Sequence, residues 1–404
     1  MFLLAAAAVG LLAVPSATLA ASERQVVRSL TKQQGKLGSS ASSMVVDLTT
    51  RKTVYAFHAE KTLAPASNEK LFVTATALLK FGVRGALTTA VAASPDATLD
   101  KKGRLDGDLY LIGGGDPTLG DAALADLAGQ VRKAGIRRIT GAIIGDESFF
   151  DDRRGGPDSG YGYDYDLGGA LGGLVWSHGA LRDGSPALAA TARFGAKLKV
   201  AGIRYARAPR VGTLPRSSTG GGAKAQAPLL GSISSPPMAD LVSAINIPSE
   251  NFYAEMLAKA LGAHFGKAGS TRSGLAVASA TLKPFSIAPQ LVDGSGLSRS
   301  NRTSALTLVT LLAGMQGSDV SDAYRASLPV AGLSGTLARR MRGTPAAGRC
   351  RAKTGTLNSV SALSGYCQTR GGRSVAFSLI ENRVCTSCAK AIEDRMVATI
   401  ARLD

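Results

Sequence analysis

Residues 65–81, PASNEKLFVTATALLKF, join a proline-containing loop to an apolar run with helical spacing. The stretch places Ser67 three residues before Lys70, so both side chains would lie on one helix face, about one turn apart. Such a pair is either a serine nucleophile with its base or an ordinary capped helix start. Ser-x-x-Lys also occurs at Ser29 and Ser387, so the motif alone does not decide between them.

Two further motifs select Ser67. Ser-x-Asn occurs once, at 249–251 (SEN), and Lys-Thr-Gly occurs once, at 353–355. Ser387 follows both motifs, and Ser29 lies in a poorly patterned segment. Ser67 precedes both and opens a helix directly after a predicted strand. The three motifs in this order indicate a serine acyl-transfer enzyme.

The residue types fit that chemistry. A buried Lys70, made less basic by burial and by the charge of Lys353, could accept the proton of Ser67. The N-terminus of the helix would favour the alkoxide. Ser249 could relay the proton to a leaving amine, and Asn251 could hold both Lys70 and the substrate amide. These five residues are the predicted catalytic set.

Lys-Thr-Gly predicts a peptide-binding edge. On an edge strand it would let a substrate add as an extra strand. Lys353 and Thr354 would bind the terminal carboxylate, and Gly355 would permit close approach of the backbone. The backbone N–H groups of Ser67 and Thr356 would hold the oxyanion.

With these motifs the chain resembles the penicillin-recognising serine D-alanyl-D-alanine carboxypeptidases, in the class C low-molecular-mass branch (peptidase family S13). DLYLIGGGDPTL (108–119), VDGSGLSRSNRTSALTL (292–308) and AKTGTLNSVSALSGY (352–366) carry the likeness, which covers about residues 40–400. It implies a DD-carboxypeptidase that cleaves peptidoglycan stem peptides through an acyl-serine and is acylated by β-lactams. DD-endopeptidase action stays open, and no cofactor or metal is expected.

The resemblance implies further substrate contacts. Relatives read the diamino acid of the stem peptide with an aspartate and an aromatic residue of an insertion, and IGDESFF (144–150) offers Asp146 and Phe150. The alternative is that Asp146 only caps a turn. Arg299 and Asn358 are expected at the same end of the substrate.

The expected fold is α/β: a β-lactamase/transpeptidase-like domain, with an antiparallel sheet flanked by helices, and a large mainly β insertion between Ser67 and Ser249. The insertion is expected to contain a helix at residues 121–135 and strands within 187–212. The predicted boundaries are a signal peptide at 1–21, the transpeptidase-like domain at 22–90 and 236–404, and the insertion, as one domain or two nested ones, at 91–235.

The N-terminus predicts export. MFLLAAAAVGLLAVPSATLAAS is an apolar run ending in small residues, as in a secretory signal cleaved after Ala20. No Lys or Arg precedes the run, so an uncleaved anchor is the alternative. Either places the protein outside the cytoplasm, in the periplasm or cell envelope.

Four cysteines fit an oxidising compartment. Cys350 and Cys367 flank a hairpin centred near Asn358, which would place them opposite each other in a cross-strand disulfide. Cys385 and Cys388 indicate a short-loop bridge or, less favoured, a redox pair. Four buried free thiols are the alternative if the chain is not exported.

The net charge of +18 favours anionic partners. Eight Lys or Arg residues and no Asp or Glu lie between Asp183 and Asp240. Nine Lys or Arg residues and no Asp or Glu lie between Asp322 and Glu381. An anionic envelope surface or carboxylate-bearing substrates fit better than nucleic acid, because export argues against nucleic acid and no binding module is recognisable.

Two rival functions remain from the sequence. One is a β-lactamase-like hydrolase on the same scaffold, and the other is a non-catalytic protein that binds the wall or senses β-lactams. A Ser-His-Asp triad lacks support, because the chain has three histidines and no Gly-x-Ser-x-Gly motif.

Overall fold

The computed structural model describes residues 16–179, 185–215 and 227–404. Most of the predicted signal peptide, residues 1–15, lies outside the described residues. Helix α1 (Ser16–Gln34) begins within the remaining part and continues past Ala20. Across the described ranges, none of the helices has the length and apolar character needed to cross a membrane.

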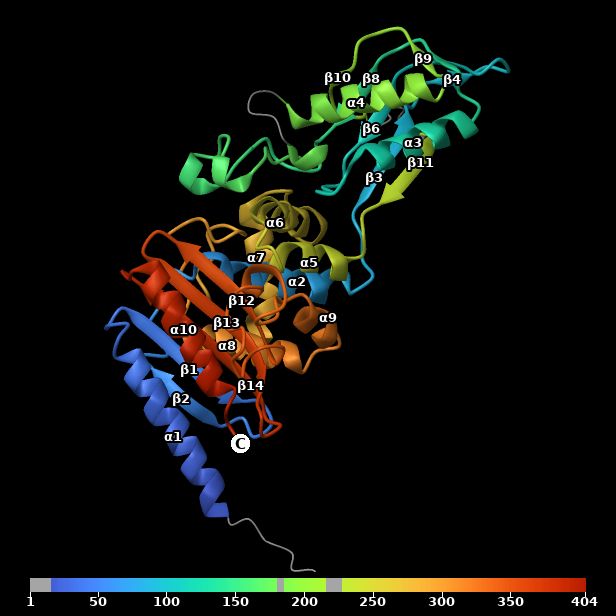
Figure 1. Cartoon of the computed structure of the whole chain (residues 1–404). Helices are drawn as coiled ribbons and strands as arrows, with labels where there is room; N and C mark the ends of the chain where they lie inside the picture. Colours follow the sequence, from blue (N-terminus) through green and yellow to red (C-terminus); the bar gives the residue numbers. More distant parts are fainter. Residues whose placement is uncertain (1–15, 180–184, 216–226) are drawn as a thin grey trace, which may run out of the picture.

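A five-stranded antiparallel sheet forms the centre of the larger body in Figure 1. Its order is β12-β13-β14-β1-β2. The strands are β1 (Ala41–Asp47), β2 (Thr53–Phe57), β12 (Cys350–Leu357), β13 (Val360–Gln368) and β14 (Ser374–Asn382). Strand β12 is at the edge, and it carries Lys-Thr-Gly. The antiparallel sheet flanked by helices confirms the expected fold class.

Helices cover both faces of this sheet. Helices α1 and α10 (Thr386–Ile400) pack on one face, where Val45, Phe377 and Met396 share a core. Helix α8 (Ala305–Gln316) packs on the other face, against β1 and β14. Because both faces are covered, the central strands are apolar along most of their length, and all of β13 except its last residue is buried.

The remaining helices of this body form a lobe around α2 (Lys70–Phe81). They are α5 (Met238–Asn246), α6 (Asn251–Phe265), α7 (Thr271–Leu282) and α9 (Ser321–Ala326). Helix α2 is buried from its first residue to Leu78. This burial fixes the position of its N-terminus, where Ser67 and Lys70 lie.

A second body is inserted between α2 and α5 (Figure 1). One sheet has the order β10-β8-β6-β3-β11, and a second, with short strands, has the order β4-β5-β7-β9. The strands are β3 (Thr88–Ala93), β4 (Thr98–Leu99), β5 (Arg104–Asp106), β6 (Leu109–Ile112), β7 (Arg138–Ile139), β8 (Ile143–Asp146), β9 (Arg204–Tyr205), β10 (Arg210–Val211) and β11 (Leu229–Ser234). Helices α3 (Asp121–Lys133) and α4 (Pro186–Val200) pack against each other and share a core with these strands. The proposed extent of the insertion stays at residues 91–235, while β3 itself begins three residues earlier, at Thr88.

The strands expected across residues 187–212 are mostly wrong, because α4 occupies the first half of that segment. Ser185 caps the helix by accepting the N–H of Leu188 at 3.2 Å, and Pro186 takes the first helical turn, where a missing N–H costs nothing. Ala187, Ala190, Phe194 and Leu198 are buried at helical spacing. Only the two-residue strands β9 and β10 follow.

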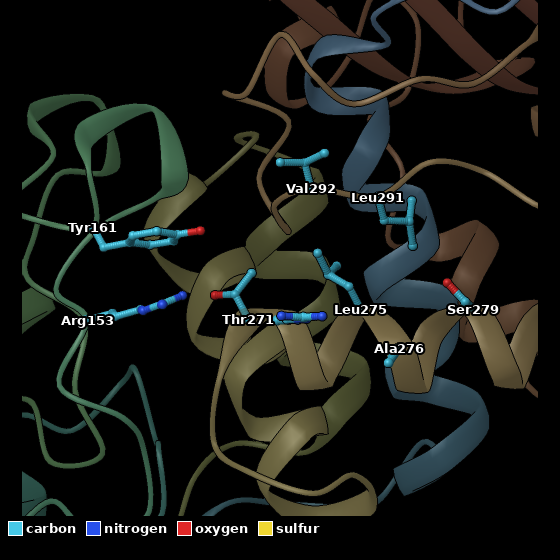
Figure 2. A pocket seen from close by; sticks show the side chains of 10 residues that line it. Arg153, Tyr161, Thr271, Leu275, Ala276, Ser279, Leu291 and Val292 are labelled. Carbon is cyan, nitrogen blue, oxygen red and sulfur yellow. The ribbon is translucent and has the colours of Figure 1, made fainter.

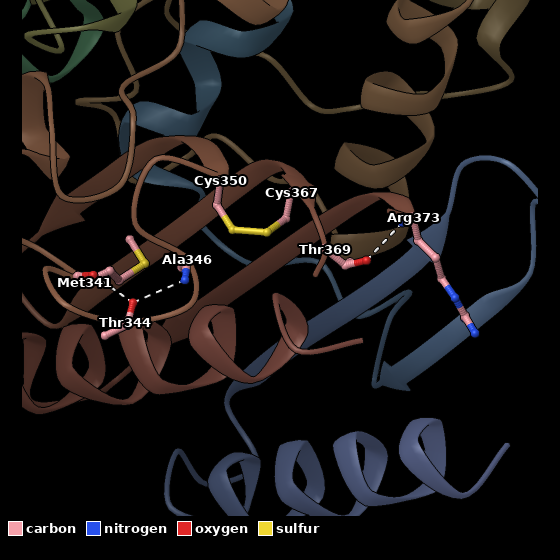
Figure 3. The surroundings of a disulfide bond; sticks show 7 residues. All are labelled: Met341, Thr344, Ala346, Cys350, Cys367, Thr369 and Arg373. Atoms are coloured by element: carbon pink, nitrogen blue, oxygen red, sulfur yellow. Dashed lines mark hydrogen bonds between the residues drawn. A yellow bond between two sulfur atoms is a disulfide. The ribbon is translucent and has the colours of Figure 1, made fainter. Parts of the chain in front are cut away.

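Both predicted disulfides are present. Cys350 and Cys367 pair across β12 and β13 and are bonded (Figure 3). Cys385 is bonded to Cys388 at the start of α10. Cys350 lies three residues before Lys353, so the first disulfide joins β12 covalently to β13 close to the Lys-Thr-Gly motif.

Candidate active site

Ser67 lies on a single 3-10 turn, Ala66–Glu69, so α2 itself begins three residues later than predicted. Ser67 is half-buried, whereas the other residues of the turn are fully buried. Asn68 donates to the hydroxyl of Ser364 at 2.8 Å, which anchors the turn to β13. The serine is therefore held in place between the helical lobe and the sheet.

Two glycines allow neighbouring segments to reach this turn. Gly296 has φ +84°, and a Cβ there would lie 2.1 Å from the carbonyl oxygen of Ala66. At Gly355, a Cβ would lie 2.5 Å from the carbonyl oxygen of Pro65. The glycine of Lys-Thr-Gly thus permits a close approach between β12 and the backbone at Pro65 and Ala66, where the serine turn begins.

The ammonium of Lys70 joins three parts of the site. It donates to Ser67 Oγ at 3.0 Å, to Asn251 Oδ1 at 2.7 Å and to the carbonyl oxygen of Ser295 at 2.5 Å. A lysine ammonium has three N–H donors, so these contacts use all of them. The predicted base therefore contacts the predicted nucleophile and the second motif directly.

Burial sets the basicity of Lys70. The side chain is fully buried, and desolvation lowers its pKa to about 8, against the opposing pull of the carboxylates of Asp293 and Glu255. About a tenth of the molecules then hold Lys70 neutral at pH 7, since the pKa lies one unit above that pH. A neutral amine at hydrogen-bond distance from a serine hydroxyl can act as a general base.

Lys353 and Ser249 form the second half of the site. The ammonium of Lys353 donates to Ser249 Oγ at 2.7 Å and to the carbonyl oxygen of Thr354 at 2.8 Å. Burial, and then the charge of Lys70, lower the pKa of Lys353 well below its ordinary value. Ser249 has φ +69°, a conformation that costs energy for a residue with a Cβ and clusters at functional sites.

The outer edge of β12 is partly covered. Ala352 donates its N–H to the carbonyl oxygen of Pro329 at 2.9 Å, so the start of the strand has a neighbour. From Lys353 onward, no strand of the described residues pairs with this edge. Thr354 donates to the hydroxyl of Thr336 at 2.8 Å, and Thr356 is exposed further along. The open part of the edge therefore begins at the motif.

Arg299 and Asn358 meet at the turn of the β12–β13 hairpin, where the Arg299 guanidinium donates to the carbonyl oxygen of Asn358 at 2.5 Å. A loop of the insertion reaches the same place. Asp158 accepts the hydroxyl of Ser298 at 2.8 Å and the N–H of Arg299 at 3.3 Å. The carbonyl oxygen of Asp166 accepts the Asn251 amide at 2.8 Å. The insertion therefore contacts the site on two sides.

Asp146 and Phe150 occupy a different environment from the one expected. Asp146, at the end of β8, accepts the N–H of Ser148 at 2.9 Å and that of Leu214 at 2.7 Å. Phe150 is buried, and its ring stacks on that of Phe149. Each carboxylate oxygen of Asp146 already has a donor, so the arrangement favours the turn-capping alternative.

Sequence reasoning missed the carboxyl groups around Lys70. Glu255, one turn after Asn251 on α6, accepts the N–H groups of Gly294 and Ser295 at 2.7 and 2.8 Å. It thereby holds the carbonyl group that binds Lys70. Burial raises the pKa of Glu255 to about 7, with Asp293 as the next cause. Only its position one helical turn from Asn251 could have signalled it.

Glu69, inside PASNEK, is the most isolated of these groups. It is fully buried, and among the residues that the structure describes neither of its carboxylate oxygens has a hydrogen-bond partner. Burial raises its pKa well above the ordinary value, and Asp293 and Glu255 add to the rise. This shift favours the neutral carboxylic acid over the carboxylate.

The middle residue of Ser-Glu-Asn also has a defined place. Glu250 caps α6 by accepting the N–H of Tyr253 at 2.7 Å. Its other carboxylate oxygen lies 3.7 Å from Nε2 of His178, in the insertion. The side chain thus serves the helix and the contact with the insertion, and His178 also stacks on the ring of Tyr253.

A family profile and individual relatives match this chain over most of its length. The profile of the D-Ala-D-Ala carboxypeptidase 3 (S13) family matches residues 23–166 and 178–403. A D-alanyl-D-alanine carboxypeptidase of Actinomadura sp. (strain R39) is 30% identical, over 90% of this chain and 81% of that protein. Carboxypeptidase DacB of Mycolicibacterium smegmatis is 31% identical, over 86% of this chain and 78% of that protein.

Solved structures share the fold. Penicillin binding protein 4 of Haemophilus influenzae superposes with a TM-score of 0.79 at 19% identity, over 92% of this chain and 99% of that one. A predatory peptidoglycan endopeptidase of Bdellovibrio bacteriovorus superposes with a TM-score of 0.59 at 17% identity, over 89% and 92%. The likeness includes the inserted body, because nearly the whole chain is covered.

Proposed function

Because the chain belongs to the D-Ala-D-Ala carboxypeptidase 3 (S13) family, we propose that it is a serine DD-carboxypeptidase that cleaves D-Ala-D-Ala stem peptides of peptidoglycan and is acylated by penicillin. One observation carries the proposal. The Lys70 ammonium contacts both Ser67 Oγ and Asn251 Oδ1, so nucleophile, base and substrate-amide ligand meet at one atom.

The reaction follows from this geometry. Ser67 Oγ attacks the carbonyl carbon of the penultimate D-Ala, and its proton passes to neutral Lys70. The backbone N–H groups of Ser67 and Thr356 hold the oxyanion. Collapse breaks the peptide bond, and the departing amine of D-Ala takes a proton through Ser249. Water then hydrolyses the acyl-serine and regenerates the hydroxyl.

Lys353 and Thr354 recognise the terminal carboxylate. Lys353 contacts Ser249, Thr354 contacts Thr336, and both residues belong to the edge strand β12, along which the peptide would lie. An arriving carboxylate would favour the protonated form of Lys353, whose pKa is otherwise lowered by burial. Binding of the correct substrate end would thereby place a full positive charge beside Ser249.

DD-endopeptidase action uses the same acyl-enzyme. The leaving amine would belong to the side chain of a neighbouring stem peptide instead of to free D-Ala. Beyond Ala352, no strand of the described residues pairs with the outer edge of β12, so a peptide from either kind of substrate could add there as an extra strand. We therefore include cross-linked stem peptides among the proposed substrates.

Outside the cytoplasm, the net charge of +18 would hold the protein to an anionic envelope. The two disulfides agree with an oxidising compartment. Binding of purified protein to isolated cell walls should weaken as salt rises from about 0.05 to 0.5 M, because exposed charges are screened over about 10 Å at 0.1 M salt. Wall binding that does not change with salt would contradict this part of the proposal.

The main test is the intact mass of the protein after incubation with penicillin, with Ser67→Ala as the control. A stable adduct on the wild type alone, together with release of D-Ala from a D-Ala-D-Ala peptide, is the expected result. No adduct and no drug consumed would overturn the enzyme assignment. Rapid drug loss without an adduct would indicate a β-lactamase-like hydrolase.

A further inference from the structure

The two disulfides of the chain differ in their exposure. Both cysteines of the short bridge, Cys385 and Cys388, are exposed, whereas Cys350 and Cys367 of the cross-strand bridge are buried. Thiol–disulfide exchange requires that an incoming thiolate reach one of the two sulfurs. A thiol in solution can therefore reach the short bridge, while the surrounding protein shields the cross-strand bridge.

The short bridge closes over the first turn of α10. Cys385 is the N-cap of this 15-residue helix, and its sulfur accepts the N–H of Cys388 at 3.3 Å. The hydroxyl of Ser387 lies 3.4 Å from the same sulfur. A helix N-terminus carries a partial positive charge, which favours a thiolate at this position. If the bridge opened, the sulfur of Cys385 would already have its donors in place.

The charges near this end of α10 are positive. Its first turn contains no acid. Arg383 precedes the bridge by two residues and is exposed, and Lys390 follows it by two residues and is half-buried. The carboxylates of Glu393 and Asp394, further along α10, are both paired with Arg340. The electrostatic surroundings of the bridge therefore also favour a thiolate.

The short bridge contributes little to the stability of the fold. It joins cysteines 3 residues apart, against 17 for the cross-strand bridge. The stabilisation that a disulfide gives through chain entropy grows with the length of the loop it closes. Opening the short bridge therefore costs the fold less than opening the cross-strand bridge would.

The bridge is reached from solvent and not through a ligand cavity. Neither of its cysteines lines the cavity of about 320 Å³ between the insertion and α7, where Arg153 and Tyr161 face Thr271 (Figure 2). The bridge lies instead at the exposed start of α10, which packs on the face of the central sheet opposite α8. A thiol at the bridge and a peptide in the active site would therefore not compete for the same space.

The segment that leads into the bridge also contacts the active site. Asn382 accepts the N–H of Ala64 and donates to its carbonyl oxygen, both at 3.0 Å, just before the serine turn. Val384 donates its N–H to the carbonyl oxygen of Ser359 at 3.3 Å, in the turn of the β12–β13 hairpin. Exchange at the bridge would thus take place beside a segment that holds both the serine turn and the Lys-Thr-Gly hairpin.

We propose that Cys385 and Cys388 form a thiol–disulfide exchange site, which accepts two electrons from a dithiol. A thiolate of the dithiol attacks Sγ of Cys388, the S–S bond breaks, and Cys385 leaves as the thiolate at the N-terminus of α10. The second thiol of the donor then attacks the mixed disulfide and releases Cys388. The donor becomes a disulfide and the chain gains two electrons, while the two protons of the donor pass to the released sulfurs or to solvent. The step uses no residue of the three motifs.

The first measurement opens the bridge in the folded, full chain. The protein is incubated with dithiothreitol at neutral pH, free thiols are alkylated with iodoacetamide, and peptide masses locate the alkyl groups. The short bridge should open at least roughly tenfold faster than the cross-strand bridge, and it should re-form after transfer to glutathione disulfide. The variant Cys385→Ser/Cys388→Ser should remain unlabelled over the same period. Equal opening rates, or a short bridge that stays closed, would overturn the proposal.

The second measurement separates an exchange site from a bridge that is merely exposed. In the reduced protein at pH 6.5, Cys385 should be alkylated roughly tenfold faster than Cys388, because the helix N-terminus favours its thiolate. Ser387→Asp places a carboxylate beside the sulfur of Cys385 and should slow its alkylation about fivefold, whereas the matched Ser387→Asn should not. Equal reactivity of the two cysteines, or equal rates in the two Ser387 variants, would reduce the bridge to an exposed structural link and overturn the proposal.

Discussion

Lys353 on the edge strand and Ser249 in the loop before α6 are joined by a hydrogen bond of 2.7 Å, which links the sheet to the helical lobe. The charge of Lys70 adds to the effect of burial in lowering the pKa of Lys353. A positive charge on Lys70 disfavours protonation of Lys353, whereas at Lys70 burial is what lowers the pKa. The site therefore has a built-in reason to keep one amine neutral before substrate arrives.

Acylation by penicillin should become faster as pH rises through about 8. The active form of Lys70 is the unprotonated amine, and burial lowers its pKa to about 8. Below that pH the neutral fraction grows about tenfold per pH unit, and above it the fraction levels off. The measurement is the rate of adduct formation from pH 6 to 10, and a flat rate would contradict the assignment. Lys70→Ala should slow acylation by roughly a thousandfold and remove the pH dependence.

Glu69→Gln should leave the pH profile of acylation in place and change the free energy of unfolding by less than about 1 kcal/mol. Burial raises the pKa of Glu69 and so favours its neutral form, and we expect the substitution to exchange one neutral group for another of similar shape. If Glu69 were ionised, its removal would lower the pKa of Lys70 and shift the profile to lower pH.

Glu255→Gln is the matched control for that experiment. This carboxyl group accepts two backbone N–H groups, and its pKa is about 7, so it carries charge above that pH. Its loss should lower the pKa of Lys70 and move the acylation profile to lower pH. An unchanged profile in Glu255→Gln would show that the nearby carboxylates do not set the basicity of Lys70.

Removing the cross-strand disulfide should cost more stability than removing the short one. Cys350 and Cys367 are 17 residues apart and Cys385 and Cys388 only 3, and the loss of chain entropy grows with loop length. We expect about 3 kcal/mol for the first double Cys→Ala variant and about half as much for the second. Denaturant unfolding of both variants measures the difference, and equal losses would contradict the loop-entropy account.

Asp146→Ala should reduce stability without changing KM. Its two carboxylate oxygens each accept a backbone N–H, and leaving both donors unpaired costs about 1–3 kcal/mol each if they stay buried. Asp146→Asn keeps one acceptor and should lose less. A raised KM for a stem peptide, with stability unchanged, would restore Asp146 to the substrate-binding role inferred from the resemblance.

The sequence predicted best where a few local residues determine the outcome. Ser-x-Asn and Lys-Thr-Gly each occur once, and the equal distances of Cys350 and Cys367 from a turn near Asn358, centred between residues 358 and 359, predicted the register of the hairpin. Helix α4 was misread because its short alanine side chains weaken the contrast between the faces, although Phe194 and Leu198 keep the helical spacing.

The sequence could not predict contacts between distant segments. Ser295 binds Lys70 through a main-chain carbonyl group, which any residue type could supply. Asp158 and Asp166 reach the site from a loop without periodic pattern. Asp166 lies 85 residues before its partner Asn251, and Asp158 lies 140 residues before its partner Ser298. Thr336 supports Thr354 through one hydroxyl from a separate loop. Such contacts depend on tertiary packing, and no local pattern encodes them.

The insertion enters and leaves the larger body at a single pair of strands. Leu87 donates its N–H to the hydroxyl of Ser235 at 3.0 Å, and Ser235 donates its N–H to the carbonyl oxygen of Leu87 at 2.8 Å. The two ends are thus about one strand spacing apart, near 5 Å. A link of a few residues would span that gap. The same junction offers protein engineers a place to exchange substrate-reading modules between relatives.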